Sequence, residues 1–233
     1  MATPHEPPYG TPHAPLLTVH GQAELEVDPE IARLAVTLTA RGRDRRTTLD
    51  DLTHRNTTAL TLIKSYGQAV ADLSTGALSI TPELGERSRG EHVRTYHGTL
   101  RLTADLTDFT ALGELTTRLA DLDLTTVDGP WWTLHPHSPA HRHAREQAVH
   151  DALQRAREYA EALNTTLAAL IQLADTGSAV TGLHPRTHRT ARMTRSAAMA
   201  HDESTPEPLD LEPQRQQVRA EVSAHFTMNP PRL

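Results

Sequence analysis

Apolar and polar residues alternate along several stretches of this chain, which is the pattern of half-buried β-strands. In the first stretch Val19, Ala23 and Leu25 share one face, and a second stretch with the same alternation follows it. Together they predict a strand, a turn at 28–30 and a second strand over Leu17–Arg41. The same alternation predicts further strands at about 77–83, 96–105, 124–135, 167–175 and 218–228.

Three other segments carry apolar residues at helical spacing. Asp44 is a suitable N-cap for a helix that Gly67 ends, and a short helix is expected over Thr107–Ala120. The clearest helix begins at Ser138, a capping residue, followed by Pro139, which suits the first helical position. Small side chains let this helix approach a sheet closely. They are alanines that recur every fourth residue, at positions 140, 144, 148, 152, 156 and 160.

Two tryptophans are adjacent in one predicted strand. Successive side chains of a strand point to opposite faces, so Trp131 and Trp132 must separate. We expect one of them in the core, and the other over an edge, a helix or a partner.

The length of 233 residues permits one large domain or two small ones. One is expected, because a chain with about 150 ordered residues buries roughly 68–70% of its unfolded surface in a single core. We place this domain at 17–177 and 215–229. Residues 1–16 are proline-rich and are expected to form a disordered arm. Residues 178–214 lack periodicity and are expected to form a flexible insertion before the closing strand.

The composition argues against several classes of protein. A formal net charge of −6, with no basic stripe interleaved with aromatic residues, argues against a nucleic-acid binder. The chain has no cysteine, which excludes disulfides, thiolate metal sites and a cysteine nucleophile. No apolar run reaches the roughly 18 residues of a membrane-spanning helix, and residues 1–16 lack the pattern of a secretion signal. We therefore expect a soluble, cytoplasmic protein without an integral membrane segment.

The fifteen histidines are the main candidates for chemistry. At the start of the alanine-rich helix His143, Glu146 and His150 project within about 60° of one another, a spacing that suits a divalent metal. The same helical wheel places these three side chains opposite the apolar face, toward solvent. Surface histidines without a ligand are the leading interpretation. A metal site at these residues is one alternative, and a pH switch is another because histidine titrates near neutrality.

Known catalytic motifs are absent from the sequence. It contains no G-x-S-x-G elbow, P-loop, G-x-G-x-x-G or H-E-x-x-H. The neighbouring carboxylates Glu24 and Glu26 belong to the polar face of the first strand, and Asp151 with Arg155 is an exposed i,i+4 pair. We therefore predict no catalytic residues, no cofactor and no enzymatic activity.

Three segments together resemble the SIMPL domain family. They are VHGQAELEVDPEIARLAVTLTARG, similar to the family's opening strands and Asp-Pro turn, AREQAVHDALQRAREYAEAL, similar to its alanine-rich helix, and QRQQVRAEVSAHFTM, similar to its closing strand. The resemblance covers Leu17 to Met228 apart from the insertion. It implies an α+β fold in which a curved, mainly antiparallel sheet is packed by two or three helices, including the long alanine-rich one.

The resemblance also implies a class of function. Bacterial members are mostly exported to the cell envelope, some are associated with stress tolerance, some self-assemble, and no catalytic residues are established for the family. The missing export signal puts the envelope location in doubt for this chain. Our first hypothesis is a self-associating structural or stress-related module, a homo-oligomer with contacts at sheet edges, at one of the two tryptophans and at the alanine-rich helix. The alternative is a module that binds a small ligand or a divalent metal, in the groove between sheet and helices or at the histidine-rich helix start.

Overall fold

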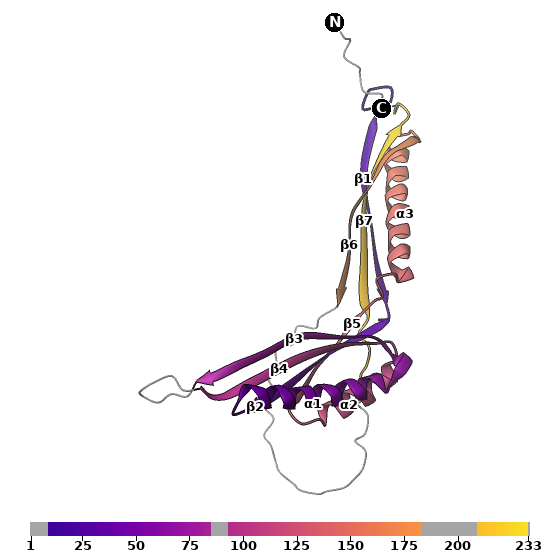
Figure 1. Cartoon of the computed structure of the whole chain (residues 1–233). Helices are drawn as coiled ribbons and strands as arrows, with labels where there is room; N and C mark the ends of the chain where they lie inside the picture. The colour runs from indigo at the N-terminus through magenta and orange to yellow at the C-terminus, as the bar shows by residue number, and fades with distance from the viewer. Residues whose placement is uncertain (1–8, 85–92, 183–208, 233) are drawn as a thin grey trace, which may run out of the picture. The chain divides into compact units, whose positions relative to one another are not determined.

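The computed structural model describes residues 9–84, 93–182 and 209–232. These residues divide into two compact units (Figure 1). Each unit has its own hydrophobic cluster. Unit 1 holds the described residues up to Asp28, those from Leu134 to 182 and those from Arg215 onward, while unit 2 holds Pro29–Thr133 and 209–214. Unit 1 is therefore assembled from segments far apart in the sequence.

Unit 1 combines an antiparallel sheet with one long helix (Figure 1). In the described residues the strand order is β1 (Leu16–Val27), β7 (Gln216–Met228) and β6 (Leu167–Gly182). Helix α3 (Pro139–Ala162) packs mainly on β1 and β7. The closing strand β7 is thus the central strand of the sheet and lies beneath the helix.

Helix α3 and strand β1 approach closely because both present very small residues. A Cβ built on Gly21 would lie 2.0 Å from the carbonyl oxygen of Ala148 and 2.6 Å from the backbone nitrogen of Ala152. The alanine ladder predicted from the sequence is confirmed, and Gly21 is where the strand meets it. The fully buried alanines of α3 are Ala144, Ala148, Ala152, Ala156 and Ala160.

Unit 2 combines a second antiparallel sheet with two helices. Among the described residues the strand order is β3 (Val70–Leu84), β4 (Val93–Leu106), β2 (Ile31–Gly42) and β5 (Thr125–Thr133). The helices and the short 3₁₀ turn of this unit are α1 (Arg45–Lys64), α2 (Phe109–Ala120) and η1 (Gly67–Ala69). Alternate residues of β2 and β4 form the buried cluster under the helices, with Leu34, Leu38 and Leu102 fully buried.

The helices begin with the expected capping chemistry. The Asp44 carboxylate accepts a hydrogen bond from the backbone N–H of Thr47 at 2.8 Å, and Ser138 Oγ accepts one from Ala140 at 3.3 Å. Such bonds satisfy N–H groups that the first helical turn leaves without a partner. The predicted helix starts at Asp44 and Ser138 are confirmed, and Asp108 caps α2 in the same way.

The two tryptophans separate as predicted. Trp132 packs against the core of unit 2 and meets the ring of Phe109 edge to face, with 4.9 Å between ring centroids. Trp131, the next residue along β5, is 44% exposed. One ring therefore belongs to the core and the other to the surface.

The strand, turn and strand predicted over Leu17–Arg41 do not form a hairpin. Strand β1 pairs with β7, whereas β2 pairs with β4 and β5. The segment 28–30 is instead the passage from unit 1 to unit 2. The α+β class and the antiparallel pairing are confirmed, but the described strands form two sheets, one packed by α3 and the other by α1 and α2. Alternation identifies a strand and its buried face, and it does not identify the strand's partner.

Within the described residues each sheet buries its apolar face under a different helix or pair of helices, so two hydrophobic clusters form. The single domain that we predicted at 17–177 and 215–229 stays a prediction, because compact units alone do not show which parts of the chain fold independently. Residues 1–8 of the expected arm and 183–208 of the expected insertion lie outside the described residues.

Candidate functional site

The predicted metal-ligand residues lie on the solvent side of α3. The side chains of His143 and Glu146 are 60% and 57% exposed, with 3.9 Å between Nδ1 and Oε2. His150, further along the helix, is exposed as well. Within the described residues no three His, Asp or Glu side chains gather as metal ligands would. The structure therefore brings His143 and Glu146 near each other and does not complete a ligand set with His150.

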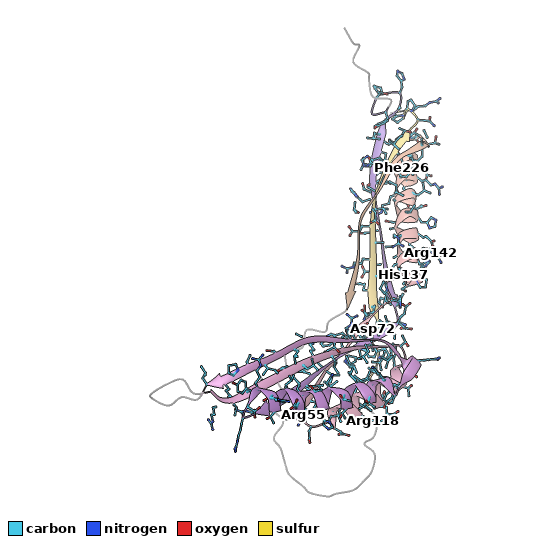
Figure 2. All side chains as sticks on the ribbon, viewed as in Figure 1. Arg55, Asp72, Arg118, His137, Arg142 and Phe226 are labelled. Carbon is cyan, nitrogen blue, oxygen red and sulfur yellow. The ribbon has the colours of Figure 1, made fainter. Side chains whose placement is uncertain are left out.

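A hollow at the start of α3 gathers basic side chains. Figure 2 labels two of them, His137 and Arg142. Positive charge at a helix start attracts anions. The lining contains no carboxylate, and the Ser138 hydroxyl accepts the capping hydrogen bond from Ala140. Its residues are Pro136, His137, Ser138, Pro139, His141, Arg142 and Arg145.

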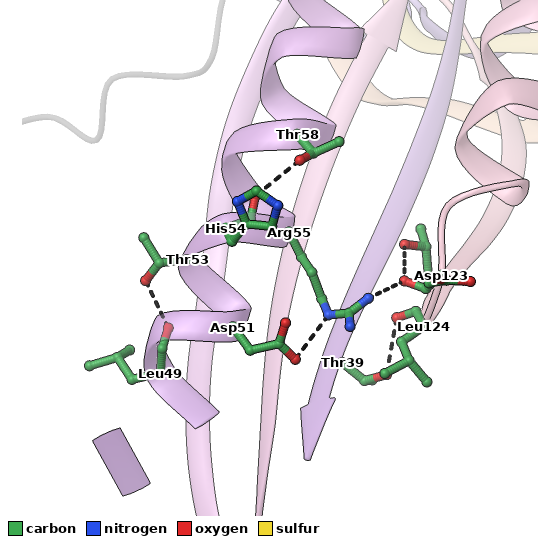
Figure 3. Close-up of polar contacts among 10 residues, drawn as sticks. Thr39, Leu49, Asp51, Thr53, His54, Arg55, Thr58, Asp123 and Leu124 are labelled. Atoms are coloured by element: carbon green, nitrogen blue, oxygen red, sulfur yellow. Dashed lines mark hydrogen bonds and ion pairs between the residues drawn. The ribbon is translucent and has the colours of Figure 1, made fainter. Parts of the chain in front are cut away.

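A groove between α1 and α2 in unit 2 is lined by hydroxyl groups and apolar side chains. The hydroxyl of Thr58, one of its lining residues, donates within the helix to the carbonyl of His54 at 3.2 Å (Figure 3). A hydroxyl used in this way already has its hydrogen-bond partner within its own helix. The groove is lined by His54, Thr57, Thr58, Thr61, Leu62, Ser65, Arg118, Asp121 and Leu122.

Arg55 ties α1 to the loop that precedes β5. Its Nε donates to Asp51 at 3.1 Å and its guanidinium donates to the carbonyl of Asp123 at 2.8 Å (Figure 3). In the same loop the carbonyl of Leu124 accepts a bond from the Thr39 hydroxyl at 3.0 Å. These contacts hold helix, loop and sheet together, which is a structural role.

Two further polar pairs of unit 2 are also structural. Arg33 donates from two nitrogens to the carboxylate of Asp105, both at 2.7 Å, and these hydrogen bonds raise the pKa of Arg33. Burial raises the pKa of Tyr66, whose hydroxyl accepts a bond from Arg118 at 3.2 Å. The first pair joins β2 to β4, and the second joins the segment after α1 to α2, so both tie elements of unit 2 together.

The most unusual surface of unit 1 is an apolar strip on β6, which we call the β6 leucine strip (Leu170 and Leu173). Leu170 pairs across the sheet with Phe226, and Leu173 pairs with Ala224. Cross-strand partners point to the same face, and both partners belong to the cluster under α3. The helix covers β7 and leaves the strip open, since Leu170 is 52% and Leu173 47% exposed.

The two edges of this sheet are not equivalent. On β1, the backbone N–H of Gln22 donates to the Asp151 carboxylate of α3 at 2.9 Å, so the helix occupies part of that edge. On the outer side of β6, no described strand pairs with the backbone. Strand β6 is therefore an open edge, and it also carries the exposed leucines.

The family model for SIMPL, described as a protein of unknown function (DUF541), matches residues 17–226. The chain belongs to the SIMPL family. The SIMPL match runs from β1 to β7 and so includes both units. The comparison with curated proteins finds no match. Membership confirms the resemblance and assigns no reaction or ligand to any residue of this SIMPL chain.

Sequence reasoning missed the β6 leucine strip. The signal was present, because the eight residues from Leu167 to Ala174 contain no charged side chain. A run of this kind indicates a strand buried on both faces, whereas β6 is largely exposed. An uncharged, apolar sequence in an exposed strand is therefore the feature that identifies the β6 leucine strip.

No helix in the described part of this SIMPL chain is long and apolar enough to span a membrane.

Proposed function

We propose that this chain is a non-enzymatic structural module that self-associates through the edge of β6. The observation that carries the proposal is the β6 leucine strip, in which two half-exposed leucines occupy the helix-side face of an open sheet edge. Unpaired strand edges with apolar side chains favour pairing with another chain. The grooves and polar pairs of the described residues supply no comparable support for catalysis.

A second copy fits this edge with two-fold symmetry. If two β6 strands meet antiparallel about an axis perpendicular to the sheet, both copies of α3 lie on the same face. The leucine strips of the two copies then meet in the valley between the two helices. Such an isologous contact is the commonest arrangement in homo-oligomers, and it removes all four leucines from water.

Charge and register set the strength of this contact. No like charges oppose each other within Leu167–Ala174, because that run is uncharged. The pairing of β6 with β7 is interrupted by register shifts, two of which lie between Leu167 and Gln172. An irregular strand forms a short hydrogen-bond ladder with a new partner, so leucine burial supplies most of the affinity. We expect a dissociation constant on the order of micromolar.

The test is to replace both leucines of the strip by lysine. Size-exclusion chromatography with light scattering at tens of micromolar should give an assembly for the wild-type chain, and Leu170→Lys with Leu173→Lys should weaken the β6 contact at least about a hundredfold. Leu16→Lys is the matched control, since Leu16 lies on the opposite edge strand, is 39% exposed and should leave association unchanged. A wild-type chain that stays monomeric at this concentration contradicts the proposal.

The ligand-binding alternative has weaker support. Hollows lie at the start of α3, between α1 and α2, and between the end of α3 and the start of β6. Among the described residues the histidine-rich helix start does not gather three ligands. A stress-related role and a cytoplasmic location stay predictions, because they rest on the family resemblance and on the sequence alone.

A further inference from the structure

We infer that the face of the unit 2 sheet turned away from α1 and α2 carries a binding site for neutral oligosaccharides, built around Trp131. This face belongs to unit 2, whereas the β6 leucine strip belongs to unit 1. The inference therefore goes beyond the proposed function and does not depend on it. The site also differs from the sheet–helix groove and the histidine-rich helix start of the ligand-binding alternative.

Four side chains form a row across this face, one from each strand of the sheet. Asp72 of β3 pairs with Asp105 of β4. Asp105 also pairs with Arg33 of β2, and Arg33 pairs with Trp131 of β5. Residues paired directly across strands point to the same face. Because the next residue after Arg33 is Leu34, which belongs to the cluster under the helices, the row points to the opposite face.

The backbone of β5 fixes the position of the Trp131 ring. A register shift places Gly129 and Pro130 opposite the single residue between Arg33 and Ala35. Bulges of this kind re-aim side chains and are common next to active sites. A Cβ built on Gly129 would lie 2.8 Å from the carbonyl oxygen of Arg33 and 3.4 Å from Cε3 of Trp131. The ring thus packs against a glycine at one edge and is 44% exposed.

Arg33 holds hydrogen-bond donors in a fixed position beside this ring. Its Nε and Nη2 both donate to the Asp105 carboxylate at 2.7 Å, and Asp105 is only 8% exposed. A bidentate pair of this kind fixes the plane of the guanidinium group. Arginine carries five N–H donors, so Asp105 does not use all of them, and the Arg33 side chain is 51% exposed. A ligand oxygen next to Trp131 can accept from Arg33 while the ion pair stays intact.

Hydrogen-bond acceptors lie on the same face. Asp128 is exposed and pairs with Ala35, the residue two positions after Arg33 on β2. Thr103 of β4 pairs with Ala35 from the other side, and Thr37 follows two positions further along β2. Carboxylates accept hydrogen bonds, and hydroxyls both donate and accept them. The surroundings of Trp131 therefore suit a ligand that has many hydroxyl groups.

The charges of this face nearly balance, which favours a neutral ligand. Two of its arginines form ion pairs within the sheet, Arg33 with Asp105 and Arg41 with Glu83. Nucleic acid needs an excess of positive charge to replace its counterions, and this face has none. In the described residues its basic side chains, apart from histidine, are Arg33, Arg41 and Arg101, and its acidic ones are Asp72, Glu83, Asp105 and Asp128.

A sugar ring matches this combination of groups better than a peptide does. A pyranose has a face of C–H groups that packs on a large aromatic ring, and a rim of hydroxyls that donate and accept. A tryptophan that anchors a protein partner is surrounded by contacts that exclude water. The neighbours of Trp131 are instead hydrated groups such as Arg33 and Asp128. Sugar hydroxyls can replace the water at these groups and keep their hydrogen bonds.

Isothermal titration calorimetry of the full chain with β-linked hexasaccharides of glucose, N-acetylglucosamine and xylose tests the inference. At least one of the three should bind saturably, with a dissociation constant of about millimolar or tighter. Trp131→Ala should weaken that binding at least about tenfold. Trp131→Tyr keeps an aromatic face and should retain most of it. Tyr159→Ala is the matched control, because Tyr159 is an aromatic residue of unit 1 that is 58% exposed, and it should bind as the wild type does.

Three results would overturn the inference. One is that none of the hexasaccharides binds at concentrations up to about 10 mM. Another is that Trp131→Ala, shown to be folded by far-UV circular dichroism, binds as tightly as the wild type, which places the sugar elsewhere. The third is that no sugar binds and Trp131→Ala lowers the mass of the wild-type assembly in light scattering, which makes Trp131 a contact between copies. A monomeric wild type that binds a hexasaccharide overturns the proposed function and supports this inference.

Discussion

Replacing Gly21 by alanine is expected to destabilise unit 1 strongly and to leave the stability of unit 2 unchanged. The added methyl would lie 2.0 Å from the carbonyl oxygen of Ala148 and 2.7 Å from the Cβ of Ala152. Overpacking costs about 1–3 kcal/mol where side chains are able to shift. Here a helix backbone blocks the methyl, so we expect unit 1 to lose roughly 3 kcal/mol or more in free energy of unfolding.

Tryptophan fluorescence reports on unit 2 alone. Both tryptophans, Trp131 and Trp132, lie in β5 of unit 2, and unit 1 contains none. Gly21→Ala should lower the denaturant midpoint of the part of the far-UV circular dichroism change that comes from unit 1, and leave the denaturant midpoint of tryptophan fluorescence unchanged. His20→Ala, on the exposed face of the same strand, is the control and should change neither signal. An unaltered circular dichroism unfolding curve in Gly21→Ala contradicts the close contact between β1 and α3.

Replacing Leu102 by alanine should destabilise unit 2 and leave unit 1 unaffected. Leu102 is fully buried between the sheet and the helices. Removing a buried leucine side chain costs about 2–5 kcal/mol, which is the lost transfer free energy plus the cavity left behind. In a small unit with a stability of about 5–15 kcal/mol, this is a large fraction of the total.

Denaturant unfolding followed by tryptophan fluorescence measures this loss directly. Leu78→Ala, an exposed leucine of the same sheet, should change the free energy of unfolding by about 0.5 kcal/mol or less. If Leu102→Ala and Leu78→Ala prove equally mild, the buried cluster of unit 2 is wrongly assigned. If Leu102→Ala also melts α3, the two units do not unfold separately.

Local chemistry made much of this fold predictable. Capping residues such as Asp44 and Ser138 fix helix starts through bonds to nearby backbone, so they can be recognised in the sequence. The alanine ladder of α3 was predictable for the same reason, since helical periodicity depends on spacing alone. Trp131 and Trp132 separated because strand geometry requires it.

Long-range pairing was not predictable from these signals. β1 and β2 are separated by a short turn and have matching alternation, yet they join different sheets. β1 finds its partner in β7, about two hundred residues later, because both offer small or β-branched residues to α3. Nothing in the local pattern of either strand contains that information.

The β6 leucine strip was unpredictable for the same reason, because it too depends on long-range packing. The helical wheel correctly placed His143 and His150 toward solvent, because their side-chain direction follows from helix geometry. The exposure of Leu170 and Leu173 depends instead on how far α3 reaches across the sheet. That reach is set by tertiary packing, so an uncharged run alone could not distinguish a buried strand from an open edge.

The most direct test of self-association at β6 is a cross-linking measurement between copies. The chain has no cysteine, so Gln172→Cys introduces a unique thiol on β6 and leaves both leucines of the strip intact. Gln22→Cys is the matched control, an exposed glutamine on the opposite edge strand of the same sheet. With a short bismaleimide, covalent dimers should form readily from Gln172→Cys, much less from Gln22→Cys, and be lost when Leu170→Lys and Leu173→Lys are added. Equal cross-linking of the two cysteine variants would contradict self-association through the β6 edge.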